Sequence, residues 1–376
     1  MNFIHYGKQT IDQEDIENVT KVLKSNFITT GPKAGEFENL LAEYCGAKYC
    51  IVVANGTAAL HLASIALLKE NDKVLTTVNS FLATSNSILY VNAKPIFVDI
   101  TNEGNIDLDL CESELKKDPS IKAIYGVSFS GNMLNQDKLK YLKETYNIKI
   151  LEDNAHAIGA VYNGIKAGSC TNSDCSIFSF HPVKHITTGE GGAITTNDKE
   201  LYERILQLRG HGLVKTEDMK PWEYEMRELG YNYRITDIQC ALGISQLKKL
   251  PLFVKRRIEI AKKYDEIFQN TIVTPLYTFN GHSSYHLYVV QIDFDKLDIT
   301  KEELFVKLHK KNISIQLHYM PINKQPYYKN LGYGDEQTPV MDQYYKRSFS
   351  IPIYPLLSDD EQNYVIKTLF ELLNGQ

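Results

Sequence analysis

The feature that most constrains the fold is an alternation of short apolar runs with amphipathic segments over the first three-quarters of the chain. The apolar runs, rich in β-branched residues, lie at 49–54, 73–78, 95–100, 121–127, 148–151, 176–180 and 192–196. Segments with helical spacing accompany them, for example at 12–24, 58–68 and 136–146. Strands that are apolar throughout and separated by helices are typical of a mostly parallel sheet covered on both faces. The sequence therefore predicts an α/β fold with a mostly parallel seven-stranded sheet flanked by helices.

The last third of the chain has a different pattern. Residues 235–268 have the composition of one long helix, in which Pro251 is expected to cause a break or a kink. Beyond it we expect a strand at 285–292, a helix at 301–311, a strand at 313–317 and a last helix at 359–373. These elements predict a smaller α+β domain. Residues 1–250 would form the large domain and residues 251–376 the small one.

Composition narrows the classes of function. The 376 residues include 41 basic and 46 acidic side chains, and this net charge of −5 argues against a dedicated nucleic-acid binder. The first ten residues lack the apolar core of a secretory signal, and the longest apolar stretch, at 58–68, is far shorter than the roughly 20 residues that span a bilayer. We therefore expect a cytoplasmic protein without membrane contact. Its six scattered cysteines form no CxxC pair and are expected to be free, buried thiols.

Polar clusters follow several of the predicted strands, where open α/β sheets bind their ligands. Asn55, Gly56 and Thr57 follow the first strand and open a helix, which suits either a bound anion or a simple cap behind a tight turn. Asp153 ends an apolar strand and is either a helix cap or a charge with a buried partner. Lys184 lies in a loop between two strands, where a lone lysine is usually a solvated charge.

These clusters allow two kinds of chemistry. The candidate ligands for a metal are Asp153, His156, His181 and His185. They lack a tight helical HxxxH spacing with a third ligand, and Pro182 disfavours a regular helix between the last two histidines. A carboxylate for a pyridine nitrogen, a lysine amine and a helix N-terminus for a phosphate instead match the needs of pyridoxal phosphate. All seven arginines lie at position 204 or beyond, so a phosphate held by the first 203 residues must rely on backbone N–H groups, hydroxyls or lysine.

Five ordered motifs resemble those of the DegT-type nucleotide-sugar aminotransferases. They are NGTAALHLA, EDNAHAIGA, SFHPVKHITTGEGGAITTN, LRGHGL and GYNYRITDIQCALGISQL. The likeness runs from about residue 3 to the end of the chain. It implies a fold-type-I transferase that depends on pyridoxal 5′-phosphate and acts as a homodimer with active sites at the interface. Within the family, the opening residues, the FHPVK-ITT-EGG form and LHYMPI are most similar to the aminotransferase of pseudaminic acid biosynthesis.

The resemblance also implies roles for residues around the cofactor. Lys184 would be the lysine that attaches the cofactor and acts as the general base. Asp153 would pair with the pyridinium nitrogen, while His156 would lie near the cofactor ring and Phe81 would stack on it. The implied phosphate contacts are Gly56, Thr57, Ala58, Ser179 and, reaching into the site of the other subunit, Asn232.

A second set of residues is implied for the sugar nucleotide. It consists of Tyr6, Asn26, Phe27, Ile28, Thr29, Gln316, Leu317, His318 and Tyr319, with Gly56, Ser179 and Asn232 serving the substrate as well. His185 departs from the family pattern, because many members carry asparagine or proline there. This difference could alter substrate contacts, but it leaves Lys184 in place.

The implied reaction moves the amino group of L-glutamate to C4 of a UDP-linked 4-keto-6-deoxy sugar. Its product is of the UDP-4-amino-4,6-dideoxy-N-acetylaltrosamine type, which belongs to pseudaminic acid biosynthesis. Two alternatives stay open, an aminotransferase for another keto sugar (perosamine, bacillosamine or 3-keto type) and a non-catalytic DegT-like regulatory protein. Because loss of the lysine is how the family abandons transamination, the presence of Lys184 argues against the regulatory alternative.

Overall fold

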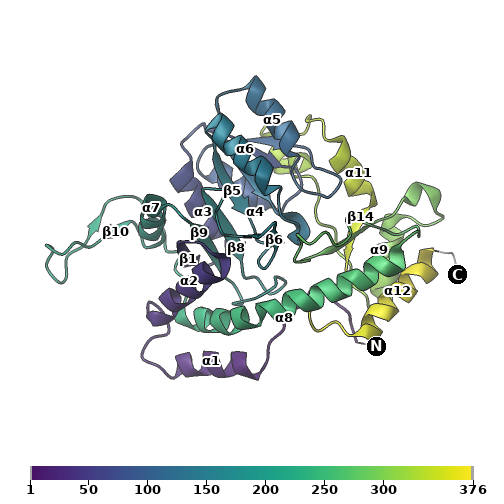
Figure 1. Cartoon of the computed structure of the whole chain (residues 1–376), viewed down its shortest axis with the longest axis horizontal. Coiled ribbons are helices and arrows are strands. Elements are labelled where there is room, and N and C mark those ends of the chain that lie inside the picture. The colour runs from purple at the N-terminus through teal and green to yellow at the C-terminus, as the bar shows by residue number, and fades with distance from the viewer. Residues whose placement is uncertain (1, 374–376) are drawn as a thin grey trace.

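The computed structural model describes residues 2–373, and its centre is a seven-stranded sheet (Figure 1). The strands, in chain order, are β1 (Tyr49–Val53), β2 (Lys73–Thr77), β3 (Lys94–Val98), β4 (Ile121–Val127), β5 (Lys149–Asp153), β8 (Cys175–Ser179) and β9 (Gly192–Thr196). Their order across the sheet is β1-β9-β8-β5-β4-β2-β3. Neighbours pair in parallel from β8 to β3, whereas β9 is antiparallel to both β1 and β8. The predicted mostly parallel sheet is confirmed.

Helices cover both faces of this sheet because its strands are apolar on both sides. Ile51 and Val53 pack on one face, beneath α3 (Gly56–Leu67), α4 (Leu82–Tyr90) and α7 (Lys199–Arg209). Cys50 and Val52 point the other way. The helices on that second face are α2 (Pro32–Cys45), α5 (Leu108–Lys117), α6 (Gln136–Tyr146) and the first half of α8 (Asp237–Phe268). The core of the sheet therefore lies in two layers, as continuous apolar strands require.

The long helix α8 corrects one expectation, because it continues through Pro251 without a break. Proline removes one helical hydrogen bond and costs about 3 kcal/mol within a helix. Both halves of α8 are firmly packed, however. Leu250 and Phe253 belong to the core beneath the sheet, while Tyr264 and Phe268 belong to the core of the C-terminal part. Packing at both ends outweighs the local cost, and α8 runs as one rod from beneath the sheet to the C-terminal elements (Figure 1).

The C-terminal part contains a three-stranded antiparallel sheet of β12 (Thr274–Pro275), β13 (Tyr288–Gln291) and β14 (Ser348–Ile351). Its helices are α9 (Lys301–Lys310), α10 (Pro326–Asn330), α11 (Pro339–Arg347) and α12 (Asp359–Leu373). The strand expected at 313–317 is wrong, since this segment makes only single bridges, from Ile313 to Ile4 and from Gln316 to Ser350, before it turns toward the large sheet. The division into domains at residues 250 and 251 falls inside α8 and stays a prediction.

Smaller elements complete the chain. They are α1 (Gln13–Leu23), the hairpin of β6 (Val161–Tyr162) with β7 (Ile165–Lys166), the hairpin of β10 (Leu213–Val214) with β11 (Glu225–Met226), and the short 3₁₀ helices η1 (Phe129–Gly131), η2 (Phe294–Lys296) and η3 (Ile322–Lys324). The second hairpin extends away from the body of the molecule (Figure 1). Within residues 2–373, no helix is both long and apolar enough to cross a membrane. All six cysteines are buried and free, as predicted.

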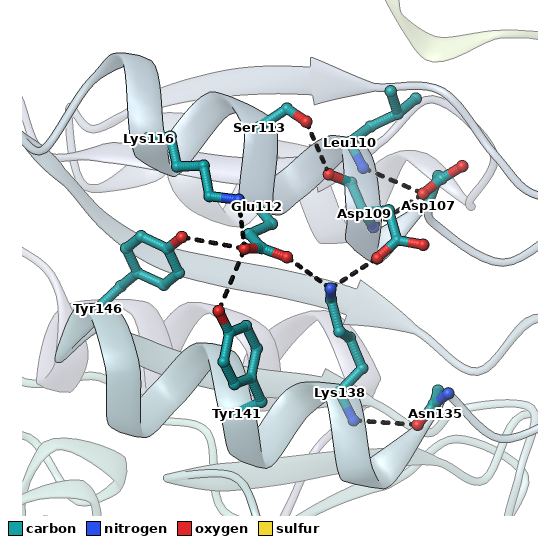
Figure 2. A network of polar contacts seen from close by, with 10 residues as sticks. All are labelled: Asp107, Asp109, Leu110, Glu112, Ser113, Lys116, Asn135, Lys138, Tyr141 and Tyr146. Atoms are coloured by element: carbon teal, nitrogen blue, oxygen red, sulfur yellow. Dashed lines mark hydrogen bonds and ion pairs between the residues drawn. The ribbon is translucent and has the colours of Figure 1, made fainter.

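On the outer surface, α5 and α6 are joined by a network of polar contacts (Figure 2). At its centre the Glu112 carboxylate accepts from Lys116 and Lys138, each at 2.6 Å, and from the hydroxyl groups of Tyr141 and Tyr146. These charges and hydrogen bonds lower the pKa of Glu112 to about 2. Glu112 and Lys138 at the centre of the network are fully paired with other side chains of the chain, so we interpret the network as a structural feature of the surface.

Candidate active site

The carboxyl ends of the parallel strands open into a cavity of about 740 Å³. Open α/β sheets bind ligands at this edge. The residues that line the cavity include Tyr6, Asn55, Gly56, Thr57, Ser80, Phe81, Thr84, Asp153, His156, Ser179, His181, Lys184, Glu190, His286, Gln316, Leu317, His318 and Tyr319. They span nearly the whole chain, so the cavity is formed by strand ends on one side and by the C-terminal part on the other.

Asp153, the last residue of β5, places a buried carboxylate in the cavity wall. Its Oδ2 accepts from the Thr84 hydroxyl at 2.7 Å, and its Oδ1 accepts from the Ala155 backbone N–H at 3.1 Å. Burial raises the pKa of this carboxyl, while the two hydrogen bonds and the charge of Lys184 oppose the shift. Asp153 therefore has features of both roles considered from the sequence. Like a cap, it accepts a hydrogen bond from the local backbone, and it is also a buried acid that would be stabilised by a cationic partner.

Lys184 lies in a turn that follows β8. Its own backbone N–H donates to the carbonyl of His181 at 2.9 Å. Surrounding protein lowers the pKa of its amine to about 8 by desolvation, and the Asp153 carboxylate works against that shift. A considerable share of the amine is therefore unprotonated near neutral pH, the form that acts as a nucleophile or base. Among the described residues that line the cavity, Lys184 is the only lysine or arginine.

The N-terminus of α3 supplies a site for an anion. Gly56 and Thr57 line the cavity, and N–H groups in the first turn of a helix have no acceptor within the helix. A Cβ on Gly56 would lie 3.0 Å from the Cβ of Ser179, so the glycine keeps the space beside that hydroxyl open. Ala58 is different. Its N–H donates to the Asn55 side chain at 2.8 Å and it does not line the cavity, so the structure does not support a ligand contact for it.

Aromatic and imidazole rings form the remaining walls. Phe81 is 60% exposed and its ring centroid lies 6.3 Å from that of Tyr319. The Tyr319 hydroxyl lies 3.2 Å from Nε2 of His156, which is buried. Burial, together with the charge of Lys184, holds the pKa of His156 well below its ordinary value. The cavity thus offers a flat apolar surface, Phe81, beside uncharged hydrogen-bonding groups.

The predicted sugar contacts separate into two groups. Tyr6 and residues 316–319 line the cavity, and the Tyr6 ring lies 5.3 Å from the His318 ring. Residues 26–29 do not line it, and instead pair with the start of α8 through a hydrogen bond from the Asp237 N–H to the Ile28 carbonyl. Phe27 and Ile28 are both at least half exposed.

Asn232 also lies outside the cavity of its own chain. It is exposed and forms a backbone bridge with Gly210. Within one copy of the chain, Asn232 therefore does not line the cavity that contains Lys184 and Asp153.

The four residues that suggested a metal point to different partners. The His181 Nδ1 accepts from the backbone of Val183, and the His185 Nε2 lies 3.0 Å from the carbonyl of Ser284. In the described part of the chain, no group of three or more histidine, cysteine, aspartate or glutamate side chains could hold a metal ion. His185 is buried behind the cavity and does not line it, so its departure from the family pattern changes an internal contact.

Sequence reasoning missed several lining residues. Thr84, which hydrogen-bonds Asp153, belongs to a polar stretch after β2, so the rule about strand ends could have identified it. Glu190 lies in the glycine-rich run after Lys184 and could have been added in the same way. His286 precedes β13 in the C-terminal part, and no local pattern marks it.

Taken together, the cavity can hold a flat cationic ring that carries an anionic group. Asp153 is a buried acceptor for a ring N–H, Gly56, Thr57 and Ser179 surround an anion site, and Lys184 supplies a reactive amine. The His156 Nδ1 is buried and has no partner among the described residues, which leaves one more polar group for a ligand.

Comparisons with known proteins agree with this geometry. The chain is 43% identical over 371 residues to the UDP-4-amino-4,6-dideoxy-N-acetyl-beta-L-altrosamine transaminase of Campylobacter jejuni, covering 98% of this chain and 97% of that protein. Helicobacter pylori PseC, an aminotransferase involved in the biosynthesis of pseudaminic acid, superposes with a TM-score of 0.94 at 32% identity over 100% of both chains. The PLP form of Spr1654 from Streptococcus pneumoniae, described as a sugar aminotransferase, superposes with a TM-score of 0.89 at 30% identity over 99% of both chains.

A family comparison completes the argument. Residues 9–370 match the sequence profile of the DegT/DnrJ/EryC1/StrS aminotransferases. Members of this family have the α/β fold found here, and the PLP-form structure indicates pyridoxal phosphate as the family's cofactor. The chain belongs to the DegT/DnrJ/EryC1/StrS aminotransferase family.

Proposed function

We propose that this protein transfers the amino group of L-glutamate to C4 of a UDP-linked 4-keto-6-deoxy sugar, with pyridoxal phosphate as cofactor. The observation that carries the proposal is the meeting of Lys184, Asp153 and the N-terminus of α3 in one cavity. The name of the Campylobacter relative supports the sugar and its C4 position, and the pathway named for PseC supports a place in pseudaminic acid biosynthesis.

When bound, pyridoxal phosphate supplies an electron-accepting pyridine ring and the carbon that receives the amino group. The residues of the chain bind the cofactor and hold or move the protons. The Asp153 carboxylate holds the proton on the pyridine nitrogen, and the pairing of opposite charges returns the pKa of Asp153 toward that of an ionised acid. Phe81 covers the ring, while the N–H groups of Gly56 and Thr57 with the Ser179 hydroxyl bind the phosphate.

Lys184 moves the proton that transamination requires. Its Nζ first takes the proton from Cα of glutamate and later delivers a proton to C4 of the sugar. Glutamate takes up the oxygen of one water and leaves as its 2-oxo acid, and the sugar ketone oxygen leaves as one water, so the amino group is exchanged with no net gain or loss of water. The lowered pKa of about 8 suits both tasks, because the amine can lose and regain a proton near neutral pH.

We further propose that the functional unit is a homodimer in which Asn232 enters the cavity of the other copy. The sugar nucleotide and the cofactor bring several phosphate charges, yet Lys184 is the only lysine or arginine that lines the cavity in the described chain. Asn232 and the adjacent Arg234 are exposed. Trp222 and Leu229, beside the hairpin of β10 and β11, are 73% and 74% exposed, which is unusual for large apolar side chains and is typical of an interface.

The cofactor and substrate assignments are tested on the purified protein. We expect a yellow protein in which borohydride fixes the cofactor on Lys184, as peptide mapping would show. Glutamate is then combined with UDP- and dTDP-linked keto sugars of the altrosamine, perosamine, bacillosamine and 3-keto series. Label on another lysine, or no amine formed from any of these sugars, would refute the proposal.

The dimer is tested by subunit exchange. Inactive Lys184→Ala protein is mixed with weakened Asn232→Ala protein, and exchange is verified with two different tags. If Asn232 serves the other copy, mixed dimers contain one site with both lesions and one with neither, so about half of the normal activity per dimer returns. Verified mixed dimers that recover no activity would show that Asn232 serves its own chain.

A further inference from the structure

His286 lines the cavity but has no role in the function proposed above. It is buried, and its ring centroid lies 4.4 Å from that of His156, with 42° between the ring planes. His156 follows β5 of the large sheet, whereas His286 precedes β13 of the C-terminal sheet. Two imidazole rings from distant parts of the chain are therefore in contact within the cavity wall.

The backbone of His286 is held by a close approach to the turn at Gly131. Gly131 has a φ of +98°, and a Cβ there would lie 2.8 Å from the Tyr285 nitrogen and 2.9 Å from the His286 nitrogen. Two hydrogen bonds close the contact, from the Ser284 N–H to the Gly131 carbonyl and from the Leu287 N–H to the Ser130 carbonyl. The segment that carries His286 thus docks onto the large sheet at a place that only glycine permits.

A buried arginine holds the same segment from the other direction. Arg257 of α8 is fully buried, and its Nη1 lies 3.2 Å from the carbonyls of Tyr285 and His286 and 2.9 Å from the carbonyl of Ile353. No carboxylate in the described chain lies within ion-pair distance of it. Burial lowers the pKa of Arg257 to about 9. Through Nη1 alone the guanidinium contacts three carbonyls, while its Nε and Nη2 have no partner among the described residues, and the Nη1 contacts hold the backbone that carries the ring.

The ring of His156 also lies 6.0 Å from the ring of Phe129, a longer distance than that to His286, and its Nε2 lies 3.2 Å from the Tyr319 hydroxyl. Tyr319 lines the cavity beside Phe81. A ring held at a single nitrogen can turn about the bond to its Cβ unless a neighbour blocks it. His286 is the imidazole that packs closest against it.

We propose that His286 is a positioning residue, which keeps the His156 ring in the orientation where Nε2 meets the Tyr319 hydroxyl. The proposal rests on the proposed function, because His156 and Tyr319 lie there beside the cofactor and the sugar. His286 acts through ring contact, so an aromatic ring is required at position 286 but its nitrogen atoms are not. Arg257 and Gly131 fix the backbone of the segment that carries this ring.

Electrostatics agrees with this arrangement. The groups that face His156 are Asp153 on its own segment, Lys184 and His185 from the loop after β8, and His286, His318 and Tyr319 from the C-terminal part. Burial and the charge of Lys184 favour the neutral ring, and Arg257 behind His286 has the same effect on that second ring. If the contact with His286 is lost, water reaches His156, and its pKa should rise toward the ordinary value of about 6.5.

The test compares two substitutions of the same residue. His286→Phe keeps a ring without nitrogen, whereas His286→Asn keeps a polar group without a ring. We expect His286→Phe to retain kcat within about threefold, and His286→Asn to lose roughly tenfold to a hundredfold, as displacement of a reacting group by an ångström can cost. His309→Asn, at an exposed histidine of α9, is the matched control and should behave as wild type.

A second readout does not depend on activity or on the cofactor. Histidine-labelled apoprotein is titrated by ¹⁵N NMR, with circular dichroism to verify folding. The His156 signal should titrate well below the ordinary histidine range in wild type and in His286→Phe, and should move up toward about pH 6.5 in His286→Asn. An unchanged His156 titration in folded His286→Asn would overturn the proposal, as would a loss in His286→Phe equal to that in His286→Asn. Because this readout needs no turnover, it separates failure of the positioning role from failure of the proposed reaction.

Discussion

On the outer surface, Glu112 of α5 meets Lys116 and Lys138 at 2.6 Å each (Figure 2). Asp153 inside the cavity, in contrast, meets no lysine or arginine of the described chain at ion-pair distance. The consequences for the two carboxyl groups are opposite. Pairing lowers the pKa of Glu112 to about 2, while burial raises the pKa of Asp153. The lysines differ in the same way, because the pKa of Lys138 is raised and that of Lys184 is lowered to about 8.

The difference shows that charged groups with a structural role and charged groups with a chemical role lie in separate places in this fold. In the surface network each charge has partners within the chain, so no group is left to bind or react. In the cavity Asp153 and Lys184 share a buried space without forming an ion pair, and desolvation shifts the pKa of each toward its neutral form. Unpaired groups of this kind mark functional sites, since a ligand supplies the missing charge.

The largest effect is expected from Lys184→Ala. The variant removes the only lysine amine that lines the cavity among residues 2–373, so amine transfer should fall by at least about a thousandfold while the fold is retained. The matched control is Lys138→Ala in the surface network, which should keep activity within about twofold. Stopped-flow and steady-state assays with glutamate and the keto sugar would check both. Substantial turnover in the Lys184 variant would place the reactive amine elsewhere.

Asp153→Asn should lower the rate by about a hundredfold or more, because the charge that stabilises a ring cation is lost in a dry site. The stability of the apoprotein should respond in the opposite sense. The folded state holds a proton on Asp153 more readily than the unfolded chain does, so ionised Asp153 opposes folding above its folded pKa. Urea unfolding near neutral pH should therefore show an apo variant at least as stable as wild type. A variant that is both active and less stable would identify Asp153 as a structural cap.

Lys184 should also leave a signature in the pH dependence of stability. Between about pH 8 and 10.5 the folded protein holds fewer protons on this amine than the unfolded chain does, so its contribution to stability rises with pH across that window. The rise attributable to Lys184 is at most about 3 kcal/mol. Comparing the urea-unfolding profiles of wild-type and Lys184→Met apoproteins isolates it from other groups. Parallel profiles for the two proteins would mean that the amine is not desolvated.

The smallest effect is expected at Glu112, where exposed charges are screened by water and salt. Glu112→Gln should lower the melting temperature by about 1 °C or less, and 1 M NaCl should remove the difference. The difference should also vanish as the pH falls from about 4.5 to about 2, because the stabilising charge is lost through the folded pKa. Differential scanning calorimetry would check both trends. Any loss of transaminase activity would contradict the separation between surface and cavity.

The sheet could be predicted because each strand has a run of apolar, often β-branched residues at its centre, and polar residues follow several of the strands. That same rule brought Gly56, Asp153 and Lys184 together, since the carboxyl ends of parallel strands share an edge. The local sequence was enough to predict the strands and the polar residues at their ends. The resemblance to the five family motifs added the expected roles of those residues.

What could not be predicted depends on contacts between distant segments. The expected strand at 313–317 is replaced by single bridges because Ile313 pairs with Ile4. His286 enters the cavity because its segment docks at Gly131, about 150 residues earlier in the chain. Proline at position 251 is expected to break or kink the helix, and packing in two separate cores prevents the break, so that α8 is continuous. Neither periodicity nor motif spacing reports such contacts.

The bridge between Ile4 and Ile313 has a consequence for the order of events during synthesis. The Ile4 N–H donates to the Asn312 carbonyl, and the Ile353 N–H donates to the carbonyl of Tyr6, so the early residues are placed by partners about 300 residues later. At a translation rate of 5–20 residues per second, Tyr6 waits roughly 15 to 60 seconds for these partners to leave the ribosome. The central sheet can assemble in the meantime, but the cavity cannot close around a substrate. A nascent chain should therefore complete the cavity only after the segment around Ile353 has left the ribosome.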